Sequence, residues 1–293
     1  MPLFDYDTAF SRNIGWVTEA EQSQLRHFRI AIAGMGGVGG VHLLTLVRLG
    51  ICKFNIADFD TFDLVNFNRQ AGASMRSLHQ SKVDVMAQQA LDINPDLDIR
   101  RFPEGVNEDN LDDFFKDVDL YVDGLDFFVF EAREAVYRAC ERLKIPAVIA
   151  APLGMGVAIV NILPGKMTFE SFFRFAGLTP EQKALHFLLG LSPALLQRGY
   201  LVAPHAVDLA AQRGPSTAMA CQLCAGAAAT EALKILLKRG KVLAAPHGYQ
   251  FDAYRNKLAH TWRPWGNHNP IQRLGLALAK RQLASRKQLA PTE

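Results

Sequence analysis

The sequence has few cysteines, little net charge and no long uncharged apolar run, and each shortage removes a reason to expect a particular class of protein. Four cysteines in 293 residues do not form a disulfide framework like that of small secreted domains. A formal net charge of +3 does not by itself imply a nucleic-acid partner. No apolar stretch reaches the roughly 18 uncharged residues of a transmembrane helix, and no N-terminal stretch has the shape of a signal peptide. We therefore expect a cytoplasmic chain with no transmembrane segment.

What is present is the alternation of an α/β protein. Hydrophobic residues make up 49% of the chain and charged residues 21%, which is typical of a globular domain with a sizeable core. The patterns predict strands at 29–33, 53–57, 97–102, 118–122 and 147–150, and helices at 38–49, 81–93, 108–114 and 129–143. This order predicts a Rossmann-like, mostly parallel sheet flanked by helices, with ligands at the carboxyl ends of its strands.

The rest of the chain is expected to surround and extend that core. We expect a polar, exposed helix at 17–27, an apolar strand at 157–163, helices at 180–190, 192–199 and 218–238, and an antiparallel hairpin near 249–262. The predicted division is an N-terminal helical segment (1–28), a nucleotide-binding core (29–165), a helical crossover region (166–217), a C-terminal helix and hairpin (218–263) and a basic amphipathic tail (264–293).

A glycine-rich turn joins the first predicted strand to the first predicted helix. Gly34, Gly36 and Gly39 form G-x-G-x-x-G, with Gly37 inside the motif. Glycines allow a tight turn and close backbone approach to phosphate, and the helix N-terminus offers unpaired N–H groups. Asp58 ends the second strand about 20 residues further on, where an acid can bind ribose hydroxyls. The segment therefore predicts a nucleotide site.

The residues after Asp58 indicate which kind of nucleotide binds. Asp60, Asn66 and Arg69 follow in a polar stretch, and Lys82 begins the next helix. Such groups beside a phosphate loop suit a triphosphate, whose charge a dinucleotide does not carry. An NAD(P)-dependent oxidoreductase stays open as an alternative, and it would bind NAD(P) and ignore ATP.

Taken in order, these motifs resemble the ThiF/MoeB/HesA family, the bacterial relatives of ubiquitin-activating enzymes. Its pattern is G-x-G-G-x-G, then D-x-D-x-V-x-x-x-N-x-x-R-Q, then a lysine, then D-x-x-D, which ends here at Asp126. Phe62 stands where a valine is usual, and Phe127 and Phe128 follow the last aspartate where an asparagine and a small residue are common. The resemblance implies an ATP-dependent adenylyltransferase that converts a carboxylate into acyl-AMP and releases pyrophosphate.

The resemblance also implies partners, cofactors and residue roles. The substrate would be the C-terminus of a ubiquitin-like protein or a small peptide. Arg69 and Lys82 would bind the triphosphate of ATP, and Asp126 would hold Mg²⁺, although an aspartate there can also cap the next helix. Arg12 would reach the ATP site of the other protomer in a homodimer.

Cysteine is missing from the crossover region, where members of this family often carry a catalytic one. No cysteine lies between Cys140 and Cys221, so we expect the adenylate to pass directly to an external nucleophile. Cys221 and Cys224 form a single C-x-x-C pair, whereas structural zinc requires four ligands. We favour buried structural thiols, with zinc or a reactive thiol as the alternatives.

The tail carries leucines among basic residues from 272 to 289. A basic amphipathic helix can bind a partner, RNA or an anionic membrane surface, or it can pack on its own domain. RNA binding would suit a second activity in the same superfamily, that of a tRNA-modifying ATP-dependent dehydratase. A non-catalytic nucleotide-binding scaffold is the remaining alternative, and the presence of Arg69, Lys82 and Asp126 argues against it.

Overall fold

One eight-stranded sheet runs through the part of the chain that the computed structural model describes, which is residues 3–209 and 211–289, with the backbone alone for 282–289. The strand order is β3-β2-β1-β4-β5-β6-β7-β8. The strands are β1 (Arg29–Ala33), β2 (Lys53–Ala57), β3 (Asp98–Phe102), β4 (Leu120–Asp123), β5 (Ala147–Leu153), β6 (Gly156–Ile162), β7 (His247–Asp252) and β8 (Lys257–Trp262). Neighbours from β3 to β5 are parallel and those from β5 to β8 antiparallel. The predicted Rossmann-like sheet with antiparallel C-terminal strands is confirmed.

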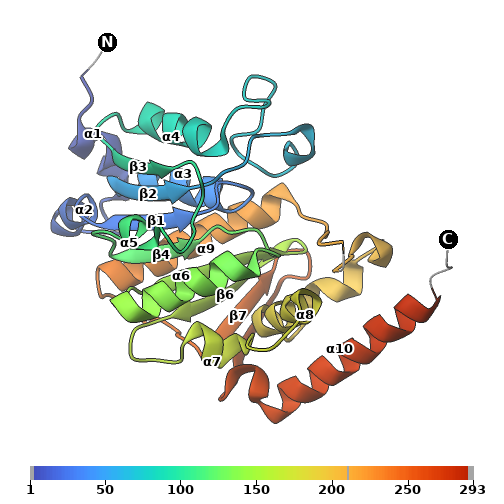
Figure 1. The fold of residues 1–293 in the computed structure, drawn as a ribbon. Helices are drawn as coiled ribbons and strands as arrows, with labels where there is room; N and C mark the ends of the chain where they lie inside the picture. Colours follow the sequence, from blue (N-terminus) through green and yellow to red (C-terminus); the bar gives the residue numbers. More distant parts are fainter. Residues whose placement is uncertain (1–2, 210, 290–293) are drawn as a thin grey trace.

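Helices cover both faces of this sheet (Figure 1). One layer contains α3 (Gly39–Leu49), α4 (Lys82–Ile93) and α9 (Ala218–Leu236). The other contains α5 (Leu111–Phe114), α6 (Phe130–Leu143), α7 (Phe169–Phe173) and α8 (Pro180–Leu191). The remaining elements are α1 (Tyr6–Phe10), η1 (Ser11–Asn13), α2 (Glu19–Leu25), η2 (Leu64–Asn66), η3 (Leu196–Tyr200), η4 (Pro204–Ala206), η5 (Gly266–His268) and α10 (Pro270–Leu289).

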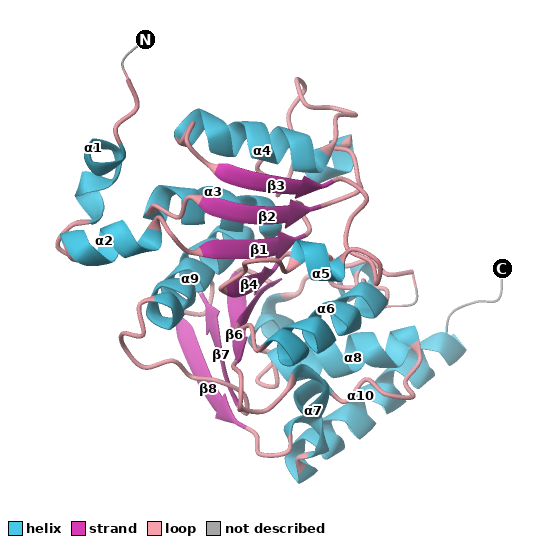
Figure 2. Cartoon of the chain, turned by 60° about the vertical axis from the view of Figure 1, so that its left-hand side comes forward, coloured by secondary structure: helices cyan, strands magenta, loops and turns pink. Residues whose placement is uncertain are grey.

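The core consists of two apolar clusters, one on each side of the sheet. In β1, Ile30 and Ile32 belong to the cluster under α3 and α9, whereas Ala31 and Ala33 belong to the cluster under α6. All five residues of β1 are buried, as expected of a parallel strand that is covered on both faces. Figure 2 shows β1, β2 and β3 pointing in one direction, so their carboxyl ends share one edge.

An aromatic cluster fills the layer formed by α6, α7 and α8. Phe169 stacks on Tyr137 with ring centroids 4.2 Å apart, and Phe187 contacts Phe127, Phe130 and Phe173 at 5.0–6.1 Å. These rings lie on the face of the sheet opposite α3 and α9. The phenylalanines of the crossover region therefore form a second half of the core.

Several predicted helices differ from those observed. Instead of a helix at 192–199, α8 ends at Leu191, the backbone turns through a left-handed Leu195, and the 3₁₀ helix η3 follows. The short helix α7 is present and was not predicted, although Thr168 caps its N-terminus. The helix predicted at 17–27 is shorter, as α2, and it is not simply exposed, because Gln22 and Leu25 are buried.

Helix α9 is long and apolar enough to cross a membrane by length and composition. It packs against β5, β6 and α3, and half of its apolar stretch is buried inside the protein. Such a helix is typical of the core of a large α/β domain.

Candidate functional site

The glycine loop begins with a backbone that only glycine adopts easily. Gly34 has φ of +88°, and its N–H donates to the carbonyl of Ala57 at 2.7 Å. A side chain on Gly34 would overlap the carbonyl of Gly124, and one on Gly39 would overlap the carbonyl of Gly34. A side chain at either position would therefore force the backbone of these loops apart.

Gly124, which the sequence analysis did not single out, completes this contact from the end of β4. A Cβ on Gly124 would lie 2.6 Å from the carbonyl oxygen of Gly34 and 2.9 Å from Cα of Gly39. The loops that follow β1 and β4 thus touch backbone to backbone at the point where the strand order reverses, which is where ligands bind in open α/β sheets. A glycine between two aspartates at the end of a strand is the signal that could have identified it.

Gly36 differs from its neighbours because the fold does not require a glycine there. An added Cβ would meet only the side chain of Gln70, at 3.6 Å or more, which is ordinary van der Waals contact. Gly36 also lacks the positive φ that requires a glycine. The space in front of Gly36 therefore fits the close approach of a phosphate.

Asp58 lies at the end of β2 and holds the glycine loop in place. Its Oδ2 accepts the N–H of Met35 at 2.6 Å, and its Oδ1 accepts the N–H of Asp60 at 2.8 Å. Burial raises the pKa of Asp58, and the two backbone donors oppose that effect. Each carboxylate oxygen keeps lone-pair capacity for a further donor such as a ribose hydroxyl.

Asp60 and Lys82 form an ion pair beside the loop. Lys82 Nζ lies 2.9 Å from Asp60 Oδ2, and Lys82 is buried while Asp60 is exposed. The backbone N–H of Lys82 also donates to the carbonyl of Asp60 at 2.9 Å. The fold thus places an ammonium group at the start of α4 with a partner that solvent or a phosphate can replace.

Asn66 organises the turn that carries Arg69. Its side-chain oxygen accepts the N–H of Asp63 at 2.9 Å, and its backbone carbonyl accepts the N–H groups of Arg69 and Gln70. The Arg69 guanidinium donates to the carbonyl of Val65 at 3.1 Å. The side chain of Arg69 also lies next to Gly37, because its Cγ is 3.6 Å from the position that a Cβ on Gly37 would occupy. Asn66 therefore positions the turn, and Arg69 borders the glycine loop.

Gln70 is a polar group of the site whose importance the motif alone did not show. It is buried against Gly36, and its Oε1 has no hydrogen-bond partner among the described residues. A buried carbonyl oxygen without a donor costs free energy, about 1–3 kcal/mol. A bound ligand with an N–H or O–H group would remove that cost.

Asp126 lies two residues beyond Gly124, after the end of β4. Its side chain is exposed, and its Oδ1 accepts the N–H of Phe128 at 3.1 Å. This bond closes a local turn and does not cap α6, whose N-cap residue is Val129 and which has no side-chain cap bond. The carboxylate therefore stays open for a ligand. The described residues contain no group of three or more His, Cys, Asp or Glu side chains that could hold a metal. A single carboxylate nevertheless suits Mg²⁺, which keeps several waters and takes other ligands from phosphates.

Asp123, by contrast, is structural. Its Oδ2 pairs with Arg133 Nε at 3.0 Å and accepts the Tyr137 hydroxyl at 3.2 Å, and both partners in the ion pair are almost fully buried. Arg133 also donates to the carbonyls of Leu125 and Asp126. The buried pair thus holds the loop that presents Asp126.

Arg12 lies far from the glycine loop of its own chain. It belongs to η1, which docks at the C-terminal end of α3, where Asn13 Nδ2 donates to the carbonyl of Leu49 at 3.2 Å. Helix α3 has 11 residues and starts at Gly39, so the two ends are about 16 Å apart. Arg12 is exposed at the end opposite to the other predicted site residues.

Cys221 and Cys224 lie in the first part of α9 and are both buried. Burial raises the pKa of both thiols. The Sγ of Cys221 lies 3.3 Å from a Cβ built on Gly37, so this thiol packs under the glycine loop. Cys224 belongs to the core cluster, and no metal-binding group of described residues includes either cysteine.

The turn between β5 and β6 borders the same edge of the sheet and is held by residues that the sequence analysis did not identify. The Tyr200 hydroxyl donates to Asp252 Oδ2 at 2.7 Å and accepts the N–H of Met155 at 2.7 Å. Thr217 Oγ1 donates to the carbonyl of Gly154 at 3.1 Å. The C-terminal third of the crossover region is thereby tied to the turn at two points.

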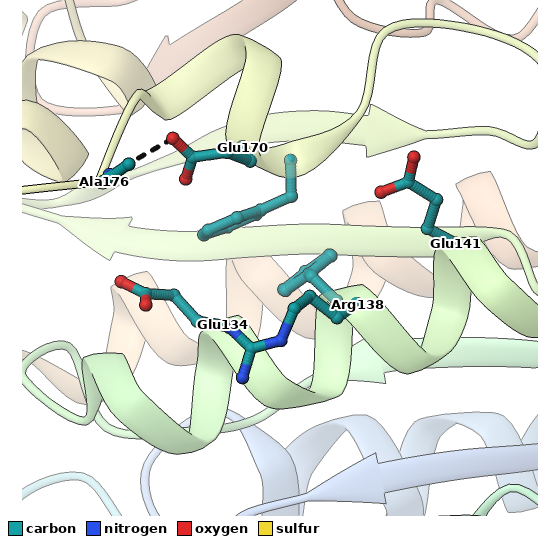
Figure 3. Close-up of a pocket in the computed structure, with 7 residues that line it drawn as sticks. Glu134, Arg138, Glu141, Glu170 and Ala176 are labelled. Atoms are coloured by element: carbon teal, nitrogen blue, oxygen red, sulfur yellow. Dashed lines mark hydrogen bonds between the residues drawn. The ribbon is translucent and has the colours of Figure 1, made fainter.

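A separate pocket of about 190 Å³ lies between α6 and α7 (Figure 3). Glu134, Arg138 and Glu141 reach it from α6, and Glu170 reaches it from α7, where its carboxylate accepts the N–H of Ala176 at 3.1 Å. None of the predicted site residues lines this pocket. The chemistry predicted from the motifs therefore belongs to the sheet edge and not to this depression.

The fold and the glycine loop define a Rossmann-like nucleotide-binding protein. The sequence profile of the ThiF family matches residues 10–272, and the chain belongs to the ThiF family. The tRNA threonylcarbamoyladenosine dehydratase of Bacillus subtilis (strain 168) is 29% identical over 140 residues, which are 47% of this chain and 54% of that protein. Protein HesA of Leptolyngbya boryana is 30% identical over 148 residues, which are 50% and 53% of the two chains. The aligned part thus spans about half the length of these relatives.

Solved structures show the same fold. Escherichia coli MccB with ATP superposes with a TM-score of 0.65 at 17% identity, covering 90% of this chain and 73% of that one. PaaA superposes with a TM-score of 0.62 at 17% identity, covering 83% and 66%. At this identity the likeness concerns the architecture. It extends beyond the nucleotide-binding strands to the antiparallel half of the sheet.

Proposed function

We propose that this chain is an ATP-dependent adenylyltransferase that activates the carboxylate of a peptide or small protein as acyl-AMP. The observation that carries the proposal is Gly36. The fold itself accepts a side chain there, so the glycine is explained by a ligand, and the neighbouring Arg69 and Lys82 suit a triphosphate. Family membership and the solved complexes of MccB with ATP, and with AMPCPP and MccA, support the same nucleotide and reaction.

In the proposed reaction a carboxylate oxygen attacks the α-phosphorus of ATP. The bond from that phosphorus to the bridging oxygen breaks, and pyrophosphate leaves. The glycine loop and the N-terminus of α3 bind the phosphates, and Arg69 and Lys82 neutralise the charge that develops on the leaving group. Asp58 accepts a ribose hydroxyl. Asp126 is the residue that would hold Mg²⁺, which supplies further neutralisation of the phosphates when it is bound.

Pyrophosphate exchange tests this proposal. Purified protein is incubated with ATP, labelled pyrophosphate and candidate carboxylate substrates, above all small proteins or peptides encoded next to its gene. Substrate-dependent incorporation of label into ATP is the expected result. If calorimetry shows binding of NAD(P) and none of ATP, the protein is an oxidoreductase and the proposal is wrong.

A second candidate is a tRNA-modifying dehydratase, because the Bacillus subtilis relative bears that name. Both reactions use ATP, so the substrate that stimulates its consumption separates them. Stimulation by tRNA and not by any peptide would favour the dehydratase. The crossover region contains no cysteine, so for the adenylyltransferase we propose direct transfer of the activated group to an external nucleophile.

We further propose that the active unit is a homodimer in which Arg12 serves the partner's ATP site. Two features support this arrangement: Arg12 lies a helix length from its own glycine loop, and apolar side chains are exposed in η2, next to the turn that carries Arg69, at Leu64 and Val65. Exposed apolar clusters of this kind mark interfaces.

Mixed chains test this assembly. Arg12→Ala and Asp126→Ala variants should each be inactive, and after reassortment one site in each heterodimer would carry both residues. Random mixing should therefore restore about a quarter of the wild-type exchange activity. Heterodimers verified by mass spectrometry that show no recovery would place Arg12 outside the partner's site.

A further inference from the structure

Helix α10 packs on the protein with one side and leaves a second apolar side uncovered. Leu276 contacts Leu185 and Leu189 of α8, and Gln272 Nε2 donates to the carbonyl of Leu189 at 2.7 Å. These contacts anchor the helix along the outer side of α8, at the edge of the molecule (Figure 1). The packing on its own domain that the sequence allowed is therefore present, and it uses only part of the helix surface.

The exposed surface of the helix carries an aliphatic stripe and, on nearly the opposite side, a basic stripe. Ile271, Leu274 and Leu278 are 83%, 63% and 50% exposed, and their spacing of three and four residues places them on one side of the helix. Arg273 and Lys280 are exposed and seven residues apart, so they share a different side.

The charge of the chain segment that contains this helix is strongly one-sided. Residues 253–292 contain eight lysines and arginines and no aspartate or glutamate. The rest of the chain then has 24 basic and 29 acidic residues, so an excess of positive charge at one end contrasts with a net negative remainder. An anionic surface attracts the first and repels the second, which would orient the molecule with α10 towards that surface.

We propose that α10 docks this protein on a membrane surface that contains anionic lipids. Ile271, Leu274 and Leu278 enter the boundary between head groups and acyl chains. Arg273 and Lys280, on the far side of the helix, add to the positive charge that attracts the helix to anionic lipids. Trp265, 62% exposed in the turn before the helix, is of the residue type enriched at that boundary. RNA would be bound by the basic stripe alone and leaves the aliphatic stripe unexplained.

Co-sedimentation of the full chain with vesicles tests the proposal. Vesicles of phosphatidylcholine and phosphatidylglycerol in a three-to-one ratio should bind the protein at low salt, and pure phosphatidylcholine vesicles should bind it weakly. The Arg273→Gln, Lys280→Gln double variant should lower the partition coefficient about 30-fold, at about fivefold for each charge removed. The Ile271→Ser, Leu274→Ser, Leu278→Ser variant should lower it about tenfold or more.

A matched control shows whether any exposed apolar side chain has this effect. Trp16 is 86% exposed and lies next to α2, on the opposite side of the molecule from α10 in Figures 1 and 2. Trp16→Ser should bind vesicles like the wild type, and thermal melting should show that every variant is folded.

Three results would overturn the proposal. The first is absence of binding to the anionic vesicles, or equal binding by the aliphatic-stripe variant and the wild type. The second is a wild-type protein that does not bind vesicles and forms a concentration-dependent dimer, together with an aliphatic-stripe variant that stays monomeric. This result would make the stripe an interface between two copies of the chain. The third is binding of bulk tRNA, without vesicle binding, that depends on the basic stripe alone.

Discussion

The two halves of the sheet position their residues by different means. In the parallel half, the glycine loop after β1 and Gly124 after β4 touch backbone to backbone, and side chains such as Asp58 bond backbone N–H groups. In the antiparallel half, the turn between β5 and β6 is held by Tyr200 and Thr217 from the crossover region. In the parallel half the close contacts require glycine, including Gly124 from a distant part of the chain, whereas the antiparallel half depends on bonds between side chains and the turn.

This difference explains why the sequence predicts the site residues of one half better than those of the other. A backbone contact leaves a motif, because only glycine fits where two chains approach closely. A side-chain bond from Tyr200 to Asp252 leaves none, since tyrosine and aspartate occur everywhere and are joined only by the fold. We expect substitutions in the nucleotide half to weaken the binding of ATP. Substitutions in the antiparallel half should instead weaken the binding of the acyl substrate.

The largest effect is expected at Asp126. Asp126→Ala should lower adenylation about 10²-fold or more while the protein stays folded, because the side chain is exposed and makes one hydrogen bond within a local turn. Calorimetry should show that Mg²⁺ strengthens ATP binding in the wild type and not in the variant. Asp109→Ala, an exposed aspartate outside the site, is the control. Near-normal exchange activity in Asp126→Ala would show that the metal assignment is wrong.

The glycines separate folding from binding within the nucleotide half. Gly36→Ala should leave the free energy of unfolding within about 0.5 kcal/mol of wild type and weaken ATP binding about tenfold or more. Gly39→Ala should destabilise the fold by about 2 kcal/mol or more, since its methyl group would overlap the carbonyl of Gly34. Urea unfolding and ATP calorimetry check both. Unchanged ATP affinity in Gly36→Ala would remove the main support for the proposed function.

His42, in the first turn of α3, makes the stability of the nucleotide half depend on pH. It is fully buried, neither ring nitrogen has a partner among the described residues, and burial lowers its pKa from 6.5 to about 3. Below pH 6.5 the imidazole of His42 is protonated in the unfolded chain and stays neutral in the folded chain. The free energy of unfolding therefore falls as the pH falls. The expected loss is about 2 kcal/mol by pH 5.

The variant His42→Leu removes this titrating group and keeps an apolar side chain in the same interior position. Its free energy of unfolding should therefore vary less between pH 7 and pH 5 than that of the wild type. Urea unfolding at several pH values measures the difference. Parallel pH profiles for the two proteins would show that His42 is not the group responsible.

The smallest effect is expected at the two cysteines of α9. Replacement of both Cys221 and Cys224 by alanine should leave ATP binding and adenylation within about twofold, at a stability cost of about 1–2 kcal/mol for lost packing. Metal analysis of the wild type should find no stoichiometric zinc. Preserved adenylation with loss of transfer to the acceptor would identify one of these thiols as a nucleophile.

Much of the fold was readable from the sequence, and the limits of that reading are physical. Periodicity located β1 and α3 closely, because parallel strands and their crossover helices have long, regular apolar patterns. It missed α7 and placed a helix at 192–199, where aromatic packing and a left-handed Leu195 decide the backbone. The basic tail was predicted as an amphipathic helix, and α10 is a helix. Two of its predicted basic residues, Arg286 and Lys287, have side chains outside the described part of the structure.

The sequence by itself determined the family, the parallel sheet and the glycine loop, because those features depend on residues close together in the chain. Only the tertiary structure separated Gly36, which the fold does not need, from Gly34 and Gly39, which it does. The structure also set Asp123 in a buried pair with Arg133 and left Asp126 open. Two aspartates three residues apart have the same chemistry in the sequence, and it is burial and the partners that the fold supplies that give them different roles.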